Sequence, residues 1–171
     1  MTRRTLLGGL AGLGAAAFGA KAANEAAAAG TAKTFPFALS ESEWAARLSP
    51  EAYRVLRGHG TERAFTSPLN NVKGPGLFHC AGCDHPLFDA KTKYDSGTGW
   101  PSFWDHLPDA IGTTEDRSFF MVRTEVHCAN CGGHLGHVFE DGPPPTGLRY
   151  CMNGVAMTFK PGVQAPSRPG A

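Results

Sequence analysis

Two short amphipathic patterns open the part of the chain that shows regular hydrophobic spacing. Ser40 and Glu43 form a capping box, in which each side chain satisfies a free backbone group of the first helical turn. Ser49 and Pro50 supply the cap and first residue of a second helix, which Gly58 would end. The apolar positions follow helical spacing in both: Trp44, Ala45 and Leu48, then Ala52, Val55 and Leu56. The pattern predicts two short helices at the start of the domain.

The rest of the chain shows the two-residue period of β-strands, interrupted by turns. Strand-like segments lie at residues 77–80, 86–88, 119–128, 134–139 and 148–159. The third alternates most regularly, since Arg123, Glu125 and His127 share one face of it. The Gly/Pro-rich run at 141–145 separates the last two. We therefore predict a mainly β domain with short N-terminal helices.

Residues 90–117 show no clear strand pattern and are predicted to form a long, ordered loop. Trp100, Phe103 and Trp104 argue against disorder there, because disordered segments are poor in aromatic residues. Loops of this length in a compact domain are usually functional when they are ordered. This segment is therefore a candidate part of a functional site.

The first thirty residues have the character of a targeting segment. Arg3 and Arg4 stand directly before the apolar run 6–18, which is rich in Gly and Ala and too short to span a bilayer as an ordinary helix. Small residues follow, with candidate cleavage points among the alanines between positions 20 and 29. This predicts a cleaved twin-arginine export signal over residues 1–30, with a Sec-type signal or a retained anchor as alternatives.

Composition adds boundaries to this picture. The chain has 171 residues, a net charge of +1, 42% hydrophobic and 18% charged residues, which is ordinary for a globular protein. We expect residues 31–160 to form a single domain, residues 161–171 a flexible tail, and the mature protein to be a monomer in the periplasm or another extracytoplasmic space. The near-neutral charge gives no basis for a nucleic-acid partner. Stable membrane association is not expected after cleavage.

Four of the five cysteines form two C-x-x-C pairs, which are Cys80 with Cys83 and Cys128 with Cys131. Two such turns supply four thiolates in tetrahedral geometry, which suits one structural zinc ion, although iron fits the same ligands. Two disulfides are the alternative in an oxidising compartment. His79 and His127, which precede the two pairs, are expected at the surface or in hydrogen bonds to the ligands rather than on the metal.

Cys151 is left without a partner. It shares the polar face of the predicted strand with Arg149 and Asn153, and a reactive thiol needs such cationic or hydrogen-bonding neighbours. His134 and His137 are histidines that can supply protons. Spacing alone leaves two readings open: a catalytic thiol, or an inert cysteine buried in the core.

Several motifs together resemble the methionine-R-sulfoxide reductases, the B type of these enzymes. The resemblance runs from about Ser40 to Phe159 and includes both C-x-x-C pairs. Its most distinctive stretches are KTKYDSGTGWPSF at 91–103, RTEV at 123–126, HLGHVF at 134–139, DGP at 141–143 and PTGLRYC at 145–151. The resemblance implies two antiparallel sheets in the β-tent arrangement, with a zinc ion at the end far from the active site.

The resemblance also implies roles for individual residues. Cys151 matches the family's sulfur nucleophile, and His134 and His137 match its paired active-site histidines. Asn153 matches a hydrogen-bonding residue beside the nucleophile, and Trp100 matches the wall that receives the methyl group of the substrate. The implied reaction is reduction of methionine-R-sulfoxide, peptide-bound or free, through a sulfenic acid on the nucleophile, with a histidine donating the proton.

One position departs from the pattern of many family members. Thr98 stands where they carry a second, resolving cysteine. With the other four thiols on a metal, the sulfenic acid on Cys151 would need an outside reductant, either a thioredoxin-like protein or a small thiol. The rival readings are a zinc-knuckle binding module with an inert Cys151, and another thiol enzyme of the same fold that acts on small-molecule thiol adducts.

Overall fold

The computed structural model describes residues 34–118 and 121–165, all within one compact unit, Lys33–Ala171. The predicted export signal and the last six residues lie outside the described residues. Within those two ranges, no helix is long and apolar enough to cross a membrane.

Two short helices open the domain as predicted, α1 (Glu41–Arg47) and α2 (Pro50–Leu56). The capping box is present in both directions, because the Ser40 side chain accepts from the Glu43 amide and the Glu43 carboxylate accepts from the Ser40 amide. The apolar faces are buried through Trp44 and Val55, whereas Ala45, predicted on the buried face, is exposed. Arg57 is the C-cap of α2 and Gly58 follows it directly, at the position where glycine commonly ends a helix.

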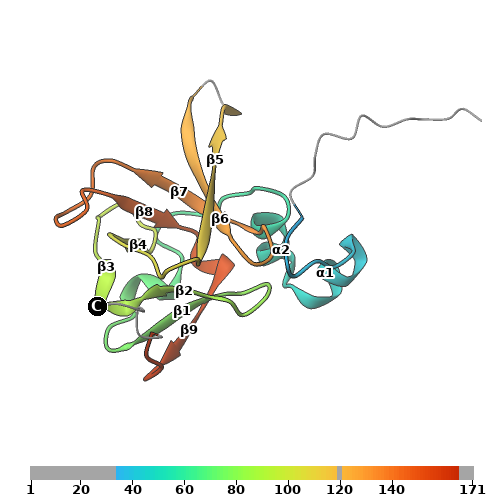
Figure 1. Cartoon of the computed structure of the whole chain (residues 1–171), viewed down its shortest axis with the longest axis horizontal. Helices are drawn as coiled ribbons and strands as arrows, with labels where there is room; N and C mark the ends of the chain where they lie inside the picture. The colour runs from blue at the N-terminus through green and yellow to red at the C-terminus, as the bar shows by residue number, and fades with distance from the viewer. Residues whose placement is uncertain (1–33, 119–120, 166–171) are drawn as a thin grey trace, which may run out of the picture. The chain divides into compact units, whose positions relative to one another are not determined.

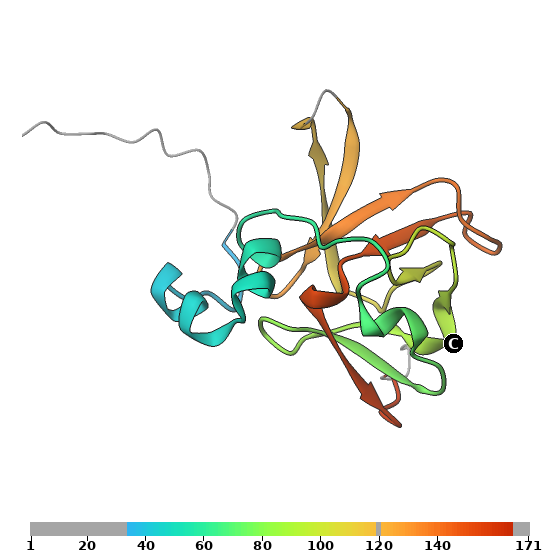
Figure 2. The same cartoon turned by 180° about the vertical axis from the view of Figure 1, so that it is seen from behind.

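In the described residues, nine strands form two antiparallel sheets, which confirms the mainly β class (Figures 1 and 2). The smaller sheet has the order β2 (Pro86–Asp89), β1 (Gly76–Cys80), β9 (Met157–Pro161). The larger sheet has the order β3 (Lys93–Tyr94), β4 (Ser102–Phe103), β8 (Arg149–Met152), β7 (His134–Phe139), β6 (Arg123–Cys128), β5 (Ile111–Asp116). The described residues also contain the short 3-10 helices η1 (Pro68–Asn71), η2 (Ala90–Thr92) and η4 (Gly154–Ala156).

Aromatic side chains join the two sheets. Phe103 of β4 stacks on Phe88 of β2 with ring centroids 4.3 Å apart, and meets Phe78 of β1 edge-on at 4.9 Å. All three rings are fully buried. Burial of a phenylalanine side chain stabilises a fold by about 1.5–3 kcal/mol, so this cluster is a main contribution to holding the sheets together. It also fixes β4, the strand next to Cys151.

Three predicted segments differ from the structure. Residues 148–159 are not one strand, because β8 and β9 lie in different sheets with η4 between them. Residues 90–117 are not one loop, because they contain β3, β4 and β5. Two of these strands are only two residues long, and β5 is an edge strand whose side chains are exposed or half-buried, so none shows an apolar alternation. The strand predicted to start at residue 119 starts at Arg123; residues 119–120 lie outside the description.

The last strand ends one residue beyond the predicted domain boundary. β9 includes Pro161, and the Gly162 amide donates to the Pro75 carbonyl at 2.9 Å.

Candidate active site

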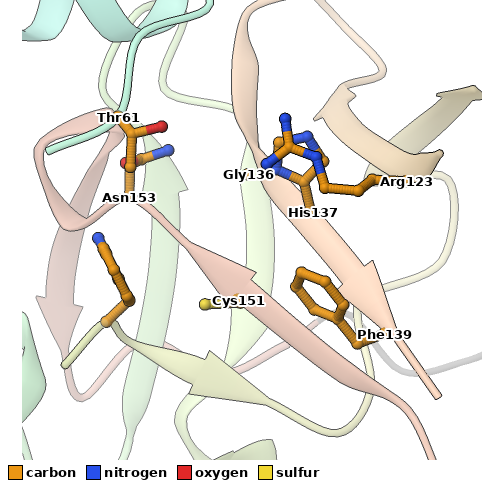
Figure 3. Close-up of a pocket in the computed structure, with 8 residues that line it drawn as sticks. Thr61, Arg123, Gly136, His137, Phe139, Cys151 and Asn153 are labelled. Atoms are coloured by element: carbon orange, nitrogen blue, oxygen red, sulfur yellow. The ribbon is translucent and has the colours of Figure 1, made fainter. Parts of the chain in front are cut away.

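A cavity at the middle of the larger sheet contains most of the residues that the sequence singled out (Figure 3). Its volume of about 180 Å³ is smaller than the roughly 300 Å³ at which sites for drug-sized ligands begin. This size suits one inserted side chain. The lining residues are Cys151, His137, Asn153, Trp100, Thr61, Arg123, Gly136 and Phe139.

Cys151 faces this cavity because of the alternation along β8. Its neighbours Tyr150 and Met152 point into the core, 7% and 0% exposed, so Cys151 lies on the opposite face. This confirms the predicted face and shows that Cys151 is half-buried at a cavity, outside the buried core. Burial raises the pKa of the Cys151 thiol, while a hydrogen bond with Thr98 and the charge of Arg149 act in the other direction.

His137 lies directly opposite Cys151 in the register of β7 and β8. Its Nε2 is 2.8 Å from Asp116 Oδ2, and Arg123 donates to the same oxygen at 2.7 Å. Hydrogen bonds hold the pKa of Asp116 well below its usual range; those from Ser118 have the largest effect, and those from His137 and Arg123 add to it. This carboxylate is therefore an ionised acceptor. His137 Nε2 therefore carries a hydrogen atom and donates a hydrogen bond to the Asp116 carboxylate.

The pKa of His137 is nevertheless lowered, because burial disfavours the imidazolium more than Asp116 favours it. Asp116 was not predicted from the sequence, because it lies in the segment that was expected to be a loop. Asp116 reaches the site because β5 pairs with β6, and the sequence alone does not show this pairing.

His134 is close to His137 but does not line the cavity. The two rings meet edge-on with centroids 5.4 Å apart. His134 is 2% exposed and its Nδ1 is 2.7 Å from Glu125 Oε1, which also contacts His59 Nδ1 at 3.0 Å. Burial alone would raise the pKa of Glu125, but hydrogen bonding and charge from His134 bring it below its ordinary value. In this structure His134 packs behind His137.

Asn153 and Trp100 are both tied to the same short segment of backbone. Asn153 is 3% exposed; its Nδ2 donates to the Leu135 carbonyl at 3.0 Å and its Oδ1 accepts from the Glu62 amide at 2.9 Å. Trp100 Nε1 donates to the Glu62 carbonyl at 3.2 Å. The peptide groups at Glu62 therefore set the position of two walls of the cavity.

The Glu62 side chain anchors this segment. Its carboxylate accepts from the Gly154 amide at 2.6 Å and the Val155 amide at 2.9 Å, directly after Asn153. Burial raises the pKa of Glu62, and the two backbone donors oppose that shift. No sequence pattern singled out Glu62, because it lies between elements in a stretch without periodicity.

A second charged pair lies beside the nucleophile. Arg149 holds Asp141 through two hydrogen bonds of 2.9 and 2.8 Å, and its guanidinium lies 4.5 Å from the centroid of the Phe139 ring. Phe139 lines the cavity and Arg149 precedes Cys151 by two residues on the same face of β8. The arrangement places a fixed positive charge near the sulfur.

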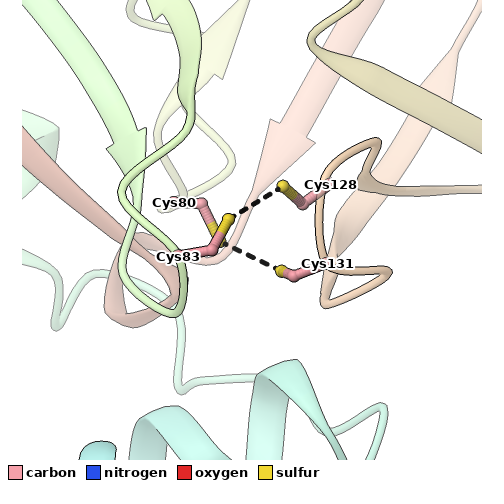
Figure 4. A group of neighbouring side chains, drawn as sticks. All are labelled: Cys80, Cys83, Cys128 and Cys131. Atoms are coloured by element: carbon pink, nitrogen blue, oxygen red, sulfur yellow. Dashed lines mark hydrogen bonds between the residues drawn. The ribbon is translucent and has the colours of Figure 1, made fainter. Parts of the chain in front are cut away.

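The four paired cysteines converge as a candidate metal centre (Figure 4). Their sulfur atoms lie within 4.8 Å of one another, with 3.7 Å between Cys80 and Cys131 and 3.6 Å between Cys83 and Cys128. A tetrahedral zinc site with 2.3 Å bonds has sulfur–sulfur edges of about 3.8 Å, so the donor set fits. All five cysteines are free, which contradicts the alternative of two disulfides.

The two turns that carry these thiols belong to different sheets. The first follows β1 of the smaller sheet and the second follows β6 of the larger one. A metal here would therefore join the sheets. Among the described residues, the cluster of four thiols includes neither His79 nor His127; both histidines are buried, so the expectation of a surface position is wrong.

Comparison with known proteins agrees with this architecture. Residues 48–161 match the SelR domain. The chain is 57% identical over 123 residues to the peptide methionine sulfoxide reductase MsrB of Agrobacterium fabrum, covering 71% of this chain and 91% of that protein. It is 59% identical over 120 residues to the MsrB of Pseudomonas putida, covering 70% and 90%. A similar match, 55% over 122 residues, links it to the MsrB of Methanosarcina barkeri, covering 71% and 86%. The chain therefore belongs to the SelR-domain family, the B-type methionine-R-sulfoxide reductases.

Proposed function

We propose that this protein reduces methionine-R-sulfoxide, peptide-bound or free, to methionine, with Cys151 as the nucleophile. The observation that carries this proposal is the pairing of Cys151 with His137 across adjacent strands, in a cavity that suits one side chain. A thiol and a proton donor on one wall are what reduction of a sulfoxide requires.

In the first step, the Cys151 thiolate attacks the sulfoxide sulfur. The His137 imidazolium gives a proton to the oxygen as the sulfur–oxygen bond weakens. The oxygen ends on Cys151 as a sulfenic acid and methionine leaves, so the sulfur of Cys151 is oxidised by two electrons and the sulfur of the substrate is reduced by two. Asp116 orients His137 for this step.

In the second step, an external thiol attacks the sulfenic acid and releases water, which leaves a mixed disulfide on Cys151. A second external thiol then displaces Cys151 and restores the thiol. Thr98 stands next to the Cys151 sulfur, at 3.9 Å, where a resolving cysteine would have to lie. The reductant is therefore a thioredoxin-like protein or a small thiol.

Selectivity for the R epimer follows from two unlike walls. The Trp100 indole is an apolar surface for the ε-methyl group, and its position is set by the hydrogen bond to the Glu62 carbonyl. His137 on β7 attracts the polar oxygen. The opposite epimer would exchange methyl and oxygen and would set each against the wrong wall. Asn153 contributes by hydrogen bonds to the backbone of Leu135 on β7 and of Glu62.

Cys80, Cys83, Cys128 and Cys131 would hold one structural zinc ion. All four positions are filled by protein thiolates, so the ion supplies stability rather than a reaction site. The site would stabilise the fold, because it joins a turn of the smaller sheet to a turn of the larger sheet.

We also propose that residues 1–30 direct export by the twin-arginine route, so that the enzyme repairs oxidised methionine outside the cytoplasm as a monomer. The support is the Arg3-Arg4 pair before a short Gly- and Ala-rich apolar run. This route carries folded proteins, which suits a chain that takes up its metal before export.

The decisive assay uses the two sulfoxide epimers separately, with a dithiol reductant. Wild type is expected to convert the R epimer and leave the S epimer. Cys151→Ser is expected to lose turnover and keep its zinc. Equal conversion of both epimers, or full activity in Cys151→Ser, would refute the proposal.

A further inference from the structure

Three side-chain hydroxyl groups form a continuous chain that ends at the nucleophile. Thr98 Oγ1 lies 3.9 Å from Cys151 Sγ and 2.8 Å from Ser96 Oγ, which lies 2.7 Å from Ser102 Oγ. Ser102 is fully buried and stands opposite Cys151 in the register of β4 and β8. The mechanism above does not use this chain.

The hydrogen bond from Ser102 to the Trp100 carbonyl sets the direction in which the three hydroxyl groups donate while Cys151 is a thiol. Ser102 Oγ donates to the Trp100 carbonyl at 3.1 Å, and a hydroxyl has only one proton to give. Ser96 must therefore donate to Ser102, and Thr98 to Ser96. The Thr98 oxygen is then left as an acceptor for the S–H group of Cys151, so every proton points away from the sulfur.

Ionisation of Cys151 reverses this order. A thiolate is only an acceptor, so Thr98 must turn its proton toward the sulfur. Ser96 then donates to Thr98 and Ser102 to Ser96, which frees the Trp100 carbonyl. The reversal needs rotation of three hydroxyl groups and no movement of a side chain. Chains of hydrogen bonds of this kind strengthen one another in a buried setting.

Two charged side chains near the sulfur have their own carboxylate partners, although Arg149 also acts on the Cys151 thiol. Arg149 is held by Asp141 through two hydrogen bonds, and His137 Nε2 is held by Asp116. The Thr98 hydroxyl lies within hydrogen-bond distance of Cys151 Sγ, and a simple rotation turns its proton toward the sulfur.

We propose that Thr98, supported by Ser96 and Ser102, is a catalytic residue that donates a hydrogen bond to the Cys151 thiolate and then to the sulfenic acid formed on it. The second part rests on the proposed function; the first does not. A hydrogen bond to a charged group is worth about 1.5–3 kcal/mol in general, which is a tenfold or larger effect on the fraction of thiolate. Because this protein depends on an external thiol, Thr98 stabilises the thiolate and the sulfenic acid of Cys151, whereas a cysteine at this position would form a disulfide with it.

The test is the rate at which iodoacetamide alkylates Cys151 at pH 7 in the zinc-loaded protein without substrate. Thr98→Val keeps the shape of the side chain and removes the hydroxyl, and we expect the rate to fall roughly tenfold. Thr98→Ser restores the hydroxyl and should react at nearly the wild-type rate. Ser96→Ala breaks the chain one step further away and should give a smaller decrease.

Thr113→Val is the matched control, since Thr113 is exposed on β5 and should leave the rate unchanged. Zinc content reports whether each variant is folded. A wild-type rate in Thr98→Val would overturn the proposal, as would a rate in Thr98→Ser as low as in Thr98→Val. Because the assay involves no turnover, its result is separate from whether the protein reduces the sulfoxide.

Discussion

His137 and Cys151 are direct neighbours across the antiparallel pair of β7 and β8. Burial shifts their pKa values in opposite directions, with the imidazole below its ordinary value and the thiol above it. The reactive ion pair, imidazolium with thiolate, is therefore a minor species of the free enzyme at every pH. Its fraction is constant between the two pKa values and depends on the difference between them.

This relationship predicts the effect of Asp116→Asn on the pH profile. Loss of the carboxylate removes the interaction that raises the pKa of His137, so that pKa falls further. The acidic limb of kcat/KM then moves to lower pH, because the imidazole stays neutral down to lower pH. The plateau falls roughly tenfold for each unit by which the two pKa values separate. Steady-state kinetics across pH measure both changes.

Glu115→Gln is the control for that experiment, because Glu115 is exposed on the same strand and pairs with Arg117. It should keep the wild-type profile. An acidic limb that moves to higher pH in Asp116→Asn would contradict the assigned contact.

The sequence predicted the parts of this site that rest on periodicity or motif. The alternation around Cys151 was enough to place its side chain opposite Tyr150 and Met152, and the spacing of the thiols was enough to group four of them. The two helices follow from their caps, which act within one turn of the chain. These are local relationships, so the sequence contains them.

Residues whose role depends on long-range pairing were not predicted. Asp116 reaches His137 because an exposed edge strand pairs with β6, and Glu62 reaches the turn after Asn153 across about ninety residues. The break between β8 and β9 was also missed, because an apolar run does not show where a chain passes from one sheet to another. His134 shares a motif with His137, yet it lies behind the cavity wall.

Replacing Thr98 by cysteine should create an internal resolving thiol. The side chain at this position already contacts Cys151 Sγ at 3.9 Å, so a small adjustment brings two sulfurs to bonding distance. After one turnover without reductant, mass spectrometry should find a disulfide between residues 98 and 151 in this variant. Wild type should show no intramolecular disulfide. A disulfide from Cys151 to Cys80 or any other metal-site thiol would contradict the assignment of four cysteines to the metal and of Cys151 to the reaction.

Glu62→Gln should weaken both the fold and the cavity. A glutamine has one acceptor oxygen and an amide donor, so one of the Gly154 and Val155 amides loses its partner. We expect a loss of about 1–3 kcal/mol in the free energy of unfolding and a higher KM, because Trp100 and Asn153 lose their common anchor. Urea titration and kinetics measure the two effects. Glu115→Gln, exposed on β5, removes the same charge and should change neither.

Removal of the metal should lower the thermal stability of the fold, because the metal takes no part in the reaction at Cys151. Cys80→Ser, or treatment with a strong chelator, is expected to lower Tm by at least roughly 10 °C, because the two sheets lose the link between their turns. Cys151→Ser should retain one zinc per chain and a wild-type Tm. Calorimetry with metal analysis makes the comparison. An unchanged Tm after complete loss of metal would contradict a structural role.

The most direct measurement is a single turnover without reductant, followed by trapping with dimedone, which reacts with sulfenic acids. With excess methionine-R-sulfoxide, the zinc-loaded enzyme should form one methionine per chain and carry one dimedone adduct, on Cys151. An adduct on one of the paired cysteines, or no methionine formed in the first turnover, would contradict the account.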